Sequence, residues 1–117
     1  MPKFNINPED KVRLRHMSDA ANEIQQYVQL STREDLDRDR KLAHSLVRLF
    51  EIIGEAAAQV SEELRDNIPE IPWSVVIGMR NRLIHAYFSI NLDIVWRTST
   101  EDIPLLITEL KNLLGEG

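Results

Sequence analysis

Apolar residues recur every three or four positions over much of this chain, which is the spacing of one face of an α-helix. Residues 17–28 follow this pattern after the sequence NPED at residues 7–10, which is typical of a helix start. Asparagine favours the cap position, proline has no N–H to leave unpaired at the first turn, and acids face the positive end of the helix dipole. The pattern therefore predicts a first helix over residues 8 to about 29.

A longer helical pattern follows the polar segment STREDLDRDR at residues 31–40, which we expect to form a connection with at most a short helical turn. Apolar residues keep the helical period from Leu42 to Leu64, and no proline interrupts the chain before Pro69. We expect one long helix there. Its Gly54 costs about 1 kcal/mol relative to alanine, and close approach of another helix is the expected compensation.

The remaining pattern predicts two more helical regions. Two prolines interrupt the chain in NIPEIPW, residues 67–73, and Pro72 can begin a third helix that runs to about residue 85 or 87. A last helical region begins near Asn91, and Pro104 should kink or divide it. No segment has the pattern of a strand. The sequence therefore predicts an all-α fold, an antiparallel up-and-down bundle of four to five helices.

Length and composition indicate one folded domain over residues 1–117, with 43% apolar and 28% charged residues. A globular chain of this length buries roughly two-thirds of the surface that its unfolded form exposes, which is enough for one core. No apolar run approaches the roughly 20 residues of a membrane span, and the polar start has no signal-peptide core. We therefore expect a cytoplasmic protein with no membrane partner.

Charge and residue types restrict the chemistry further. The net charge of -5 argues against a protein that coats nucleic acid through bulk electrostatics, so any anion site must be local. The absence of cysteine excludes disulfides, thiolate zinc sites and a cysteine nucleophile. His16 and His44 lack the companion residues of helical metal motifs, so we expect no metal and no cofactor.

The segment RNRLIHAYF, residues 80–88, places cations among large apolar side chains. On a helical wheel Arg80 falls inside the apolar arc of the third helix. Because an isolated buried guanidinium would cost several kcal/mol, Arg80 must form an ion pair, line a cavity or face a partner chain. Glu51 and Glu55, one turn apart on the long helix, are candidate partners.

His85 lies about 140° around an ideal helix from Arg80, so the two do not share one face. Either the helix ends before His85, or another chain completes the site. Arg82 is either a surface residue or a further phosphate contact.

Arg80, four residues, His85, one residue and Tyr87 together resemble the R-x4-H-x-Y signature of HEPN domains, and in particular of the HepT toxins of MNT/HEPN toxin–antitoxin systems. The blocks EIIGEAA (51–57), PEIPW (69–73), IGMRNRLIHAYF (77–88) and DIVW (93–96) stand in the order of that branch. The resemblance therefore covers most of the chain.

This resemblance implies a metal-independent endoribonuclease toxin that forms a homodimer in which the two R-x4-H motifs face each other. It also implies a cognate MNT nucleotidyltransferase antitoxin that adenylylates the tyrosine. Carried over to this sequence, Arg80 and His85 are catalytic, Asn81 is the polar residue that follows the arginine, and Tyr87 is the acceptor that becomes O-AMP-tyrosine.

The residue types suit the cleavage of RNA. Because RNA carries its own nucleophile in the 2′-hydroxyl, an enzyme need only move protons and stabilise charge on the phosphate. A histidine with an ordinary pKa near 6.5 can transfer the protons, and an arginine fork can hold two phosphate oxygens. The alternative is a non-catalytic helical dimerisation module that binds a nucleotidyltransferase or a nucleotide and uses Arg80 as an interface bridge. The two hypotheses differ in whether His85 can reach a phosphate that Arg80 binds.

Overall fold

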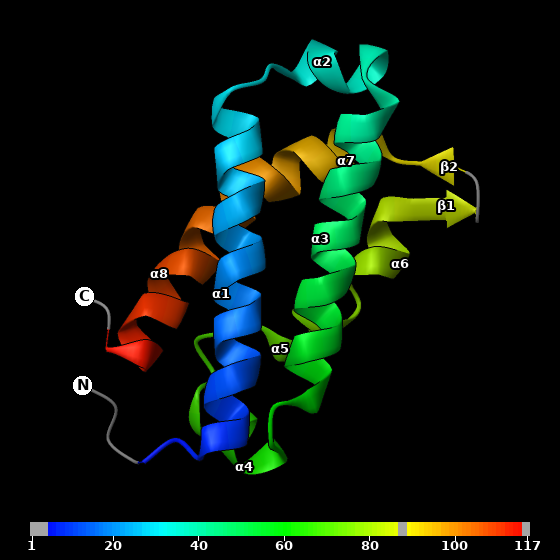
Figure 1. Ribbon diagram of the computed structural model, residues 1–117. Coiled ribbons are helices and arrows are strands. Elements are labelled where there is room, and N and C mark those ends of the chain that lie inside the picture. The colour runs from blue at the N-terminus through cyan, green and yellow to red at the C-terminus, as the bar shows by residue number, and fades with distance from the viewer. Residues whose placement is uncertain (1–4, 87–88, 116–117) are drawn as a thin grey trace.

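Two long antiparallel helices form the centre of the computed structural model, which describes residues 5–86 and 89–115 except for the side chains of residues 85 and 86. Helix α1 (Pro8–Gln29) packs against both α3 (Arg40–Gln59) and the C-terminal helix α8 (Ile103–Leu114) (Figure 1). The predicted start of α1 is confirmed, because the Asn7 side chain accepts a hydrogen bond from the Asp10 N–H at 2.7 Å.

Short elements connect and cover these long helices. They are α2 (Arg33–Arg38), α4 (Glu62–Asn67), α5 (Trp73–Ile77), α6 (Met79–Leu83), β1 (Ile84–Ala86), β2 (Ser89–Ile90), α7 (Leu92–Arg97) and the π-helical segment η1 (Thr98–Asp102). The all-α class is confirmed, and α2 is the expected short turn. In its capping box, the Thr32 N–H donates to Asp35 at 2.8 Å and lowers the pKa of that carboxyl. The last helical region is divided before Pro104, as predicted.

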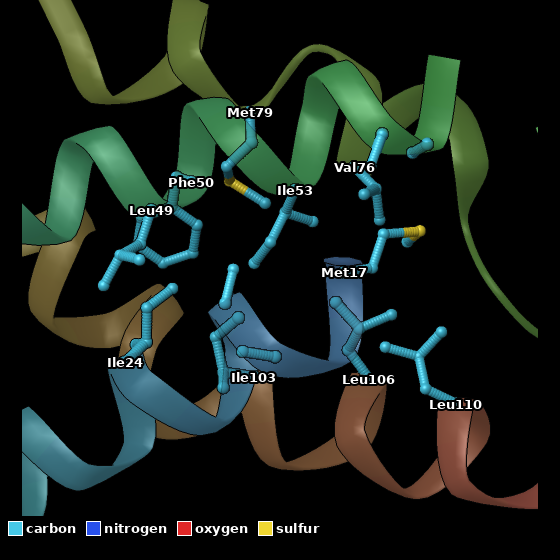
Figure 2. Packing of buried hydrophobic residues seen from close by; sticks show 14 of the residues in the cluster. Met17, Ile24, Leu49, Phe50, Ile53, Val76, Met79, Ile103, Leu106 and Leu110 are labelled. Atoms are coloured by element: carbon cyan, nitrogen blue, oxygen red, sulfur yellow. The ribbon is translucent and has the colours of Figure 1, made fainter. Parts of the chain in front are cut away.

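The core lies where the faces of α1, α3, α5, α6 and α8 meet (Figure 2). Phe50 and Ile53 of α3, almost fully buried, occupy its centre. Gly54 confirms the expected close approach of another helix, because a Cβ built there would lie 3.1 Å from the carbonyl oxygen of Ile77 and 3.3 Å from that of Val76. No helix in the described part of the chain is long and apolar enough to cross a membrane.

The long helix ends earlier than its apolar pattern predicts. Helix α3 stops at Gln59, and the Ser61 hydroxyl caps the separate helix α4 by accepting from the Leu64 N–H at 3.2 Å. The Ser61 N–H and hydroxyl in turn donate to the buried carboxylate of Asp10 at 2.8 and 2.6 Å. The prediction of one helix to Leu64 is wrong because this contact with α1 stabilises a break that the local pattern does not reveal.

The predicted third helix is also divided. Its first part ends at Ile77, Gly78 separates it from the second part, which ends at Leu83, and the chain then forms the antiparallel β1–β2 pair, with Ile84 opposite Ile90. The Asn91 N–H donates to the Leu83 carbonyl at 2.7 Å and brings the chain back to the bundle. The predictions of a helix to residue 85 or 87 and of a chain without strands are therefore wrong. The β1–β2 pair projects from the side of the bundle beside α6 and α7 (Figure 1).

Candidate functional site at the junction of helices α3 and α6

Arg80 lies on α6 beside α3, and its side chain is 52% exposed. The expectation that it falls within a buried apolar arc is wrong, because the division at Gly78 breaks the continuous helix that the wheel assumes. Its Nε lies 3.3 Å from Oε2 of Glu51, which confirms Glu51 as an internal partner. Glu55 pairs with Arg48 instead.

Arg48 brings a second guanidinium to the same carboxylate. Its Nη1 lies 3.9 Å from Oε2 of Glu51 and donates to Oε1 of Glu55 at 3.4 Å. Arg48 is 61% exposed, whereas Glu51 is 26% exposed. Two arginines from different helices therefore meet at one carboxylate oxygen on an open surface. The sequence pattern does not single out Arg48, although its spacing from Glu51 and Glu55 places it on their face of the helix.

These exposed ion pairs leave the arginines accessible to an anion. Pairs between solvent-exposed charges contribute only about 0–1 kcal/mol, since water screens them. A phosphate offers Arg48 and Arg80 the two-pronged contact that guanidinium groups prefer, so it can compete with Glu51 for them. The junction is thus suited to binding an anion with more than one charged oxygen.

The other expected site residues lie close to Arg80 in the sequence but belong to different environments. Asn81 is exposed on α6. The backbone of His85 lies in β1, beyond the end of α6, whereas its side chain and the whole of Tyr87 lie outside the part of the chain that the structure describes. Of the two explanations for the 140° offset, the structure supports the end of the helix before His85.

The end of the β1–β2 pair is fixed to the bundle by side chains. Asn91 caps α7 by accepting from the Ile94 N–H at 3.1 Å. Arg33 of α2 donates two hydrogen bonds to Oδ1 of Asp93, at 2.9 and 2.7 Å. These bonds raise the pKa of the Arg33 guanidinium, which is charged at physiological pH in any case. The segment that carries His85 therefore leaves and re-enters the bundle at defined positions.

Arg82 belongs to a different part of the surface from Arg80. It is exposed and lines a groove of about 600 Å³ together with Val75 of α5 and Leu105 and Glu109 of α8. Positions 80 and 82 differ by about 200° on a helix, which accounts for their separation. Within the described residues, no three histidine, aspartate or glutamate side chains gather closely enough to hold a metal ion.

Comparison with known proteins places these residues in a family context. The sequence model of the family described as "Ribonuclease HepT-like" matches residues 17–113. A protein of Thermococcus cleftensis named probable ribonuclease HepT is 35% identical over 100 residues, which cover 86% of this chain and 91% of the relative. A protein of Caldanaerobacter subterraneus subsp. tengcongensis with a provisional RNase name is 41% identical over 81 residues, 69% of this chain and 72% of the relative. No solved structure matches the chain significantly.

Proposed function

Because the chain belongs to the HepT-like ribonuclease family, we propose that it is an endoribonuclease that needs no metal ion and acts as the toxin of a toxin–antitoxin system. The observation that carries the proposal is the exposed guanidinium of Arg80, held by Glu51 near the start of α6, with His85 following where the helix has ended. A cation accessible to phosphate and a residue able to transfer protons thus belong to adjacent elements. These are the two groups that cleavage of RNA by its own 2′-hydroxyl requires.

In this mechanism Arg80 binds the scissile phosphate and stabilises the charge that develops on its oxygens. His85 removes the proton of the 2′-hydroxyl or donates one to the leaving 5′-oxygen, since an imidazole can act as base or acid near neutral pH. Asn81, exposed beside Arg80, orients the phosphate. In a homodimer with the motifs facing each other, the second His85 supplies the other proton transfer. No step needs a metal-bound hydroxide.

Tyr87 is the proposed point of control by a cognate MNT nucleotidyltransferase antitoxin. It stands two residues after His85 in the sequence. Transfer of AMP to its hydroxyl would add a negatively charged phosphodiester and a nucleoside close to the groups that bind RNA. The charge would compete with substrate phosphate for arginine, and the nucleoside would occupy space that the substrate needs. Adenylylation at Tyr87 therefore accounts for neutralisation of the toxin.

The test of the proposed activity is RNA cleavage by purified protein in the presence of EDTA. We expect Arg80→Ala and His85→Ala each to lower the cleavage rate by roughly 100-fold or more, as for the loss of an acid, a base or a charge-stabilising donor. Arg80→Lys should recover only part of the rate, because an ammonium lacks the fork of a guanidinium. The matched control is Lys111→Ala, the loss of an exposed cation on α8.

Circular dichroism and light scattering should show that all these variants keep the fold and assembly of the parent. A substrate with a single 2′-deoxy nucleotide at the cleavage position should remain uncut there. Cleavage at the parental rate by either alanine variant, or of the 2′-deoxy substrate, contradicts the mechanism. A folded protein without any cleavage of RNA would favour the non-catalytic dimerisation module.

A further inference from the structure

The exposed face of α3 carries a line of basic residues that leads to the arginine junction. Positions 41, 44, 48, 51 and 55 are separated by three or four residues, so their side chains lie on one face of the helix. Lys41, His44 and Arg48 occupy the first part of this face and are exposed, whereas Glu51 and Glu55 occupy the second part. We call Lys41, His44 and Arg48 the α3 basic stripe.

The stripe ends where Arg48 and Arg80 meet at Oε2 of Glu51. From Lys41 to Arg48 it extends along about 10 Å of the helix axis, since each residue adds about 1.5 Å. Cations spread over that distance contact successive phosphates of a strand rather than a single one. In a protein of net charge -5, such a local stripe gives an RNA strand a preferred direction of approach.

We propose that the α3 basic stripe is a second RNA-binding site, which holds the phosphates of a single strand and directs that strand to Arg80. The inference rests on the proposed ribonuclease function and adds Lys41 and Arg48 as substrate-binding residues. Arg48 links the stripe to the candidate site, because the carboxylate that it contacts is also the partner of Arg80. A phosphate bound by Arg48 therefore lies next to the phosphate bound by Arg80.

Binding of RNA, measured separately from its cleavage, tests the stripe. The probe is a fluorescent single strand of about 20 nucleotides with 2′-O-methyl groups, which cannot react through its 2′ position. Its dissociation constant is measured by anisotropy over a series of salt concentrations for the parent, Lys41→Gln, Arg48→Gln and the matched control Lys111→Gln. Circular dichroism accompanies each variant.

We expect Lys41→Gln and Arg48→Gln each to weaken RNA binding several-fold. Each should also reduce the steepness of the plot of log binding constant against log salt concentration by about 0.7, which is the change for one lost phosphate contact to a single strand. Lys111→Gln should keep the parental slope. With cleavable RNA, Arg48→Gln should raise KM several-fold with little change in kcat, because it removes binding rather than chemistry. Lys41→Gln keeps the test decisive if Arg48→Gln is unstable.

The outcomes separate this inference from the proposed function. If the protein cleaves RNA and both glutamine variants keep the parental salt slope, the stripe does not bind RNA. The proposed ribonuclease function is not affected by that result. If the variants reduce the salt slope but the protein does not cleave RNA, the stripe binds RNA and the proposed ribonuclease function is wrong. Displacement of the probe by polyglutamate as effectively as by unlabelled RNA, at equal charge concentration, would overturn RNA as the occupant and indicate an acidic protein partner.

Discussion

Glu51 has two opposing effects on the candidate site. Its carboxylate fixes the guanidinium of Arg80 at 3.3 Å, and the same oxygen atom draws in Arg48. The negative charge that orients the arginines also repels an incoming phosphate. Turnover and affinity for RNA therefore depend on this residue in opposite directions.

Replacing Glu51 with glutamine should separate these two effects. We expect Glu51→Gln to bind RNA several-fold more tightly, because Arg80 then loses its charged competitor for phosphate and Arg48 keeps only Glu55. Its cleavage should be several-fold slower, because Arg80 loses the ion pair that orients it. Anisotropy with non-cleavable RNA and single-turnover cleavage measure the two quantities.

Glu55→Gln is the matched control, since Glu55 pairs with Arg48 and, within the described residues, forms no ion pair with Arg80. It should tighten binding without slowing cleavage. Equal slowing by both substitutions would mean that Glu51 does not act through Arg80.

Gly54 shows how one missing side chain permits the packing of α5 on α3. A methyl group there would lie 3.1 Å from a backbone carbonyl oxygen, which cannot move without shifting α5. Overpacking of this kind costs about 1–3 kcal/mol, against a gain of about 1 kcal/mol in helix propensity. We expect Gly54→Ala to lower the free energy of unfolding by about 1 kcal/mol, measured by urea denaturation.

The control for helix propensity is Ala58→Gly, at an exposed position of the same helix. Ala58→Gly should lower the free energy of unfolding by about 1 kcal/mol, because glycine has a lower helix propensity than alanine. An increase in stability for Gly54→Ala would show that α5 adjusts to the added methyl group.

At the scale of single residues, the sequence was most informative where chemistry depends on residue type. Arg80 and Glu51 could be paired because a cation among apolar residues needs a partner, and the structure confirms the pair. The exposure of Arg80 could not be predicted, since it depends on the break at Gly78. Arg48 was missed because an arginine near glutamates on an exposed helix face is common in proteins of any function.

Helix breaks show which elements the local pattern can predict. The bounds of α1 follow from its cap and apolar period, whereas the division between α3 and α4 does not, because Val60 and Leu64 keep that period across the break. The group that stabilises the break, Asp10, is 51 residues away from Ser61 in the sequence. The β1–β2 pair likewise depends on a backbone contact between Leu83 and Asn91 that no short pattern reveals.

The contact between Asp10 and Ser61 should therefore contribute substantially to stability. The carboxylate, 4% exposed, accepts from the Ser61 N–H, the Ser61 hydroxyl and the Asn7 side-chain amide. In Asp10→Asn the new NH₂ group would face one of these donors. We expect a loss of about 1–3 kcal/mol in the free energy of unfolding, the cost of an unsatisfied buried polar group.

Urea denaturation at neutral pH measures this loss, with Asp66→Asn on the exposed surface of α4 as the control. Ser61→Ala should lose a similar amount, and the double variant should lose less than the sum of the two single variants. Strict additivity would mean that Asp10 and Ser61 act independently.

In the whole molecule, the candidate site and the hydrophobic core are separate. The core lies where α1, α3, α5, α6 and α8 meet (Figure 2), whereas Arg48 and Arg80 are exposed at 61% and 52% and the β1–β2 pair projects from the side of the bundle (Figure 1). This separation leaves the site open to a second copy of the chain. It also means that substitutions at the site can alter chemistry without unfolding the bundle.

We expect a homodimer with two-fold symmetry in which Arg80 and His85 of both chains lie near the axis. Light scattering at micromolar concentration should give twice the mass of the 117-residue chain. Mixing Arg80→Ala with His85→Ala should restore part of the cleavage, because in a shared site one arginine and one histidine remain intact. A monomeric mass, or no recovery in mixtures that exchange subunits, contradicts a shared site.

The hydrogen bond from the Asn91 N–H to the Leu83 carbonyl holds together the two residues that flank residues 84–90. Neither of these two residues belongs to the segment itself. The ion pair between Arg33 and Asp93 reinforces the second end from outside the segment. Closing a loop between fixed ends becomes only slowly more costly with length, by about 0.6 kcal/mol for each doubling. Changes in the length and sequence of residues 85–89 should therefore cost the bundle little, whereas Ile84 and Ile90 are constrained because they pack against the core. The residue types of this segment, and with them its chemistry, can therefore change during evolution or design while the helical bundle stays the same.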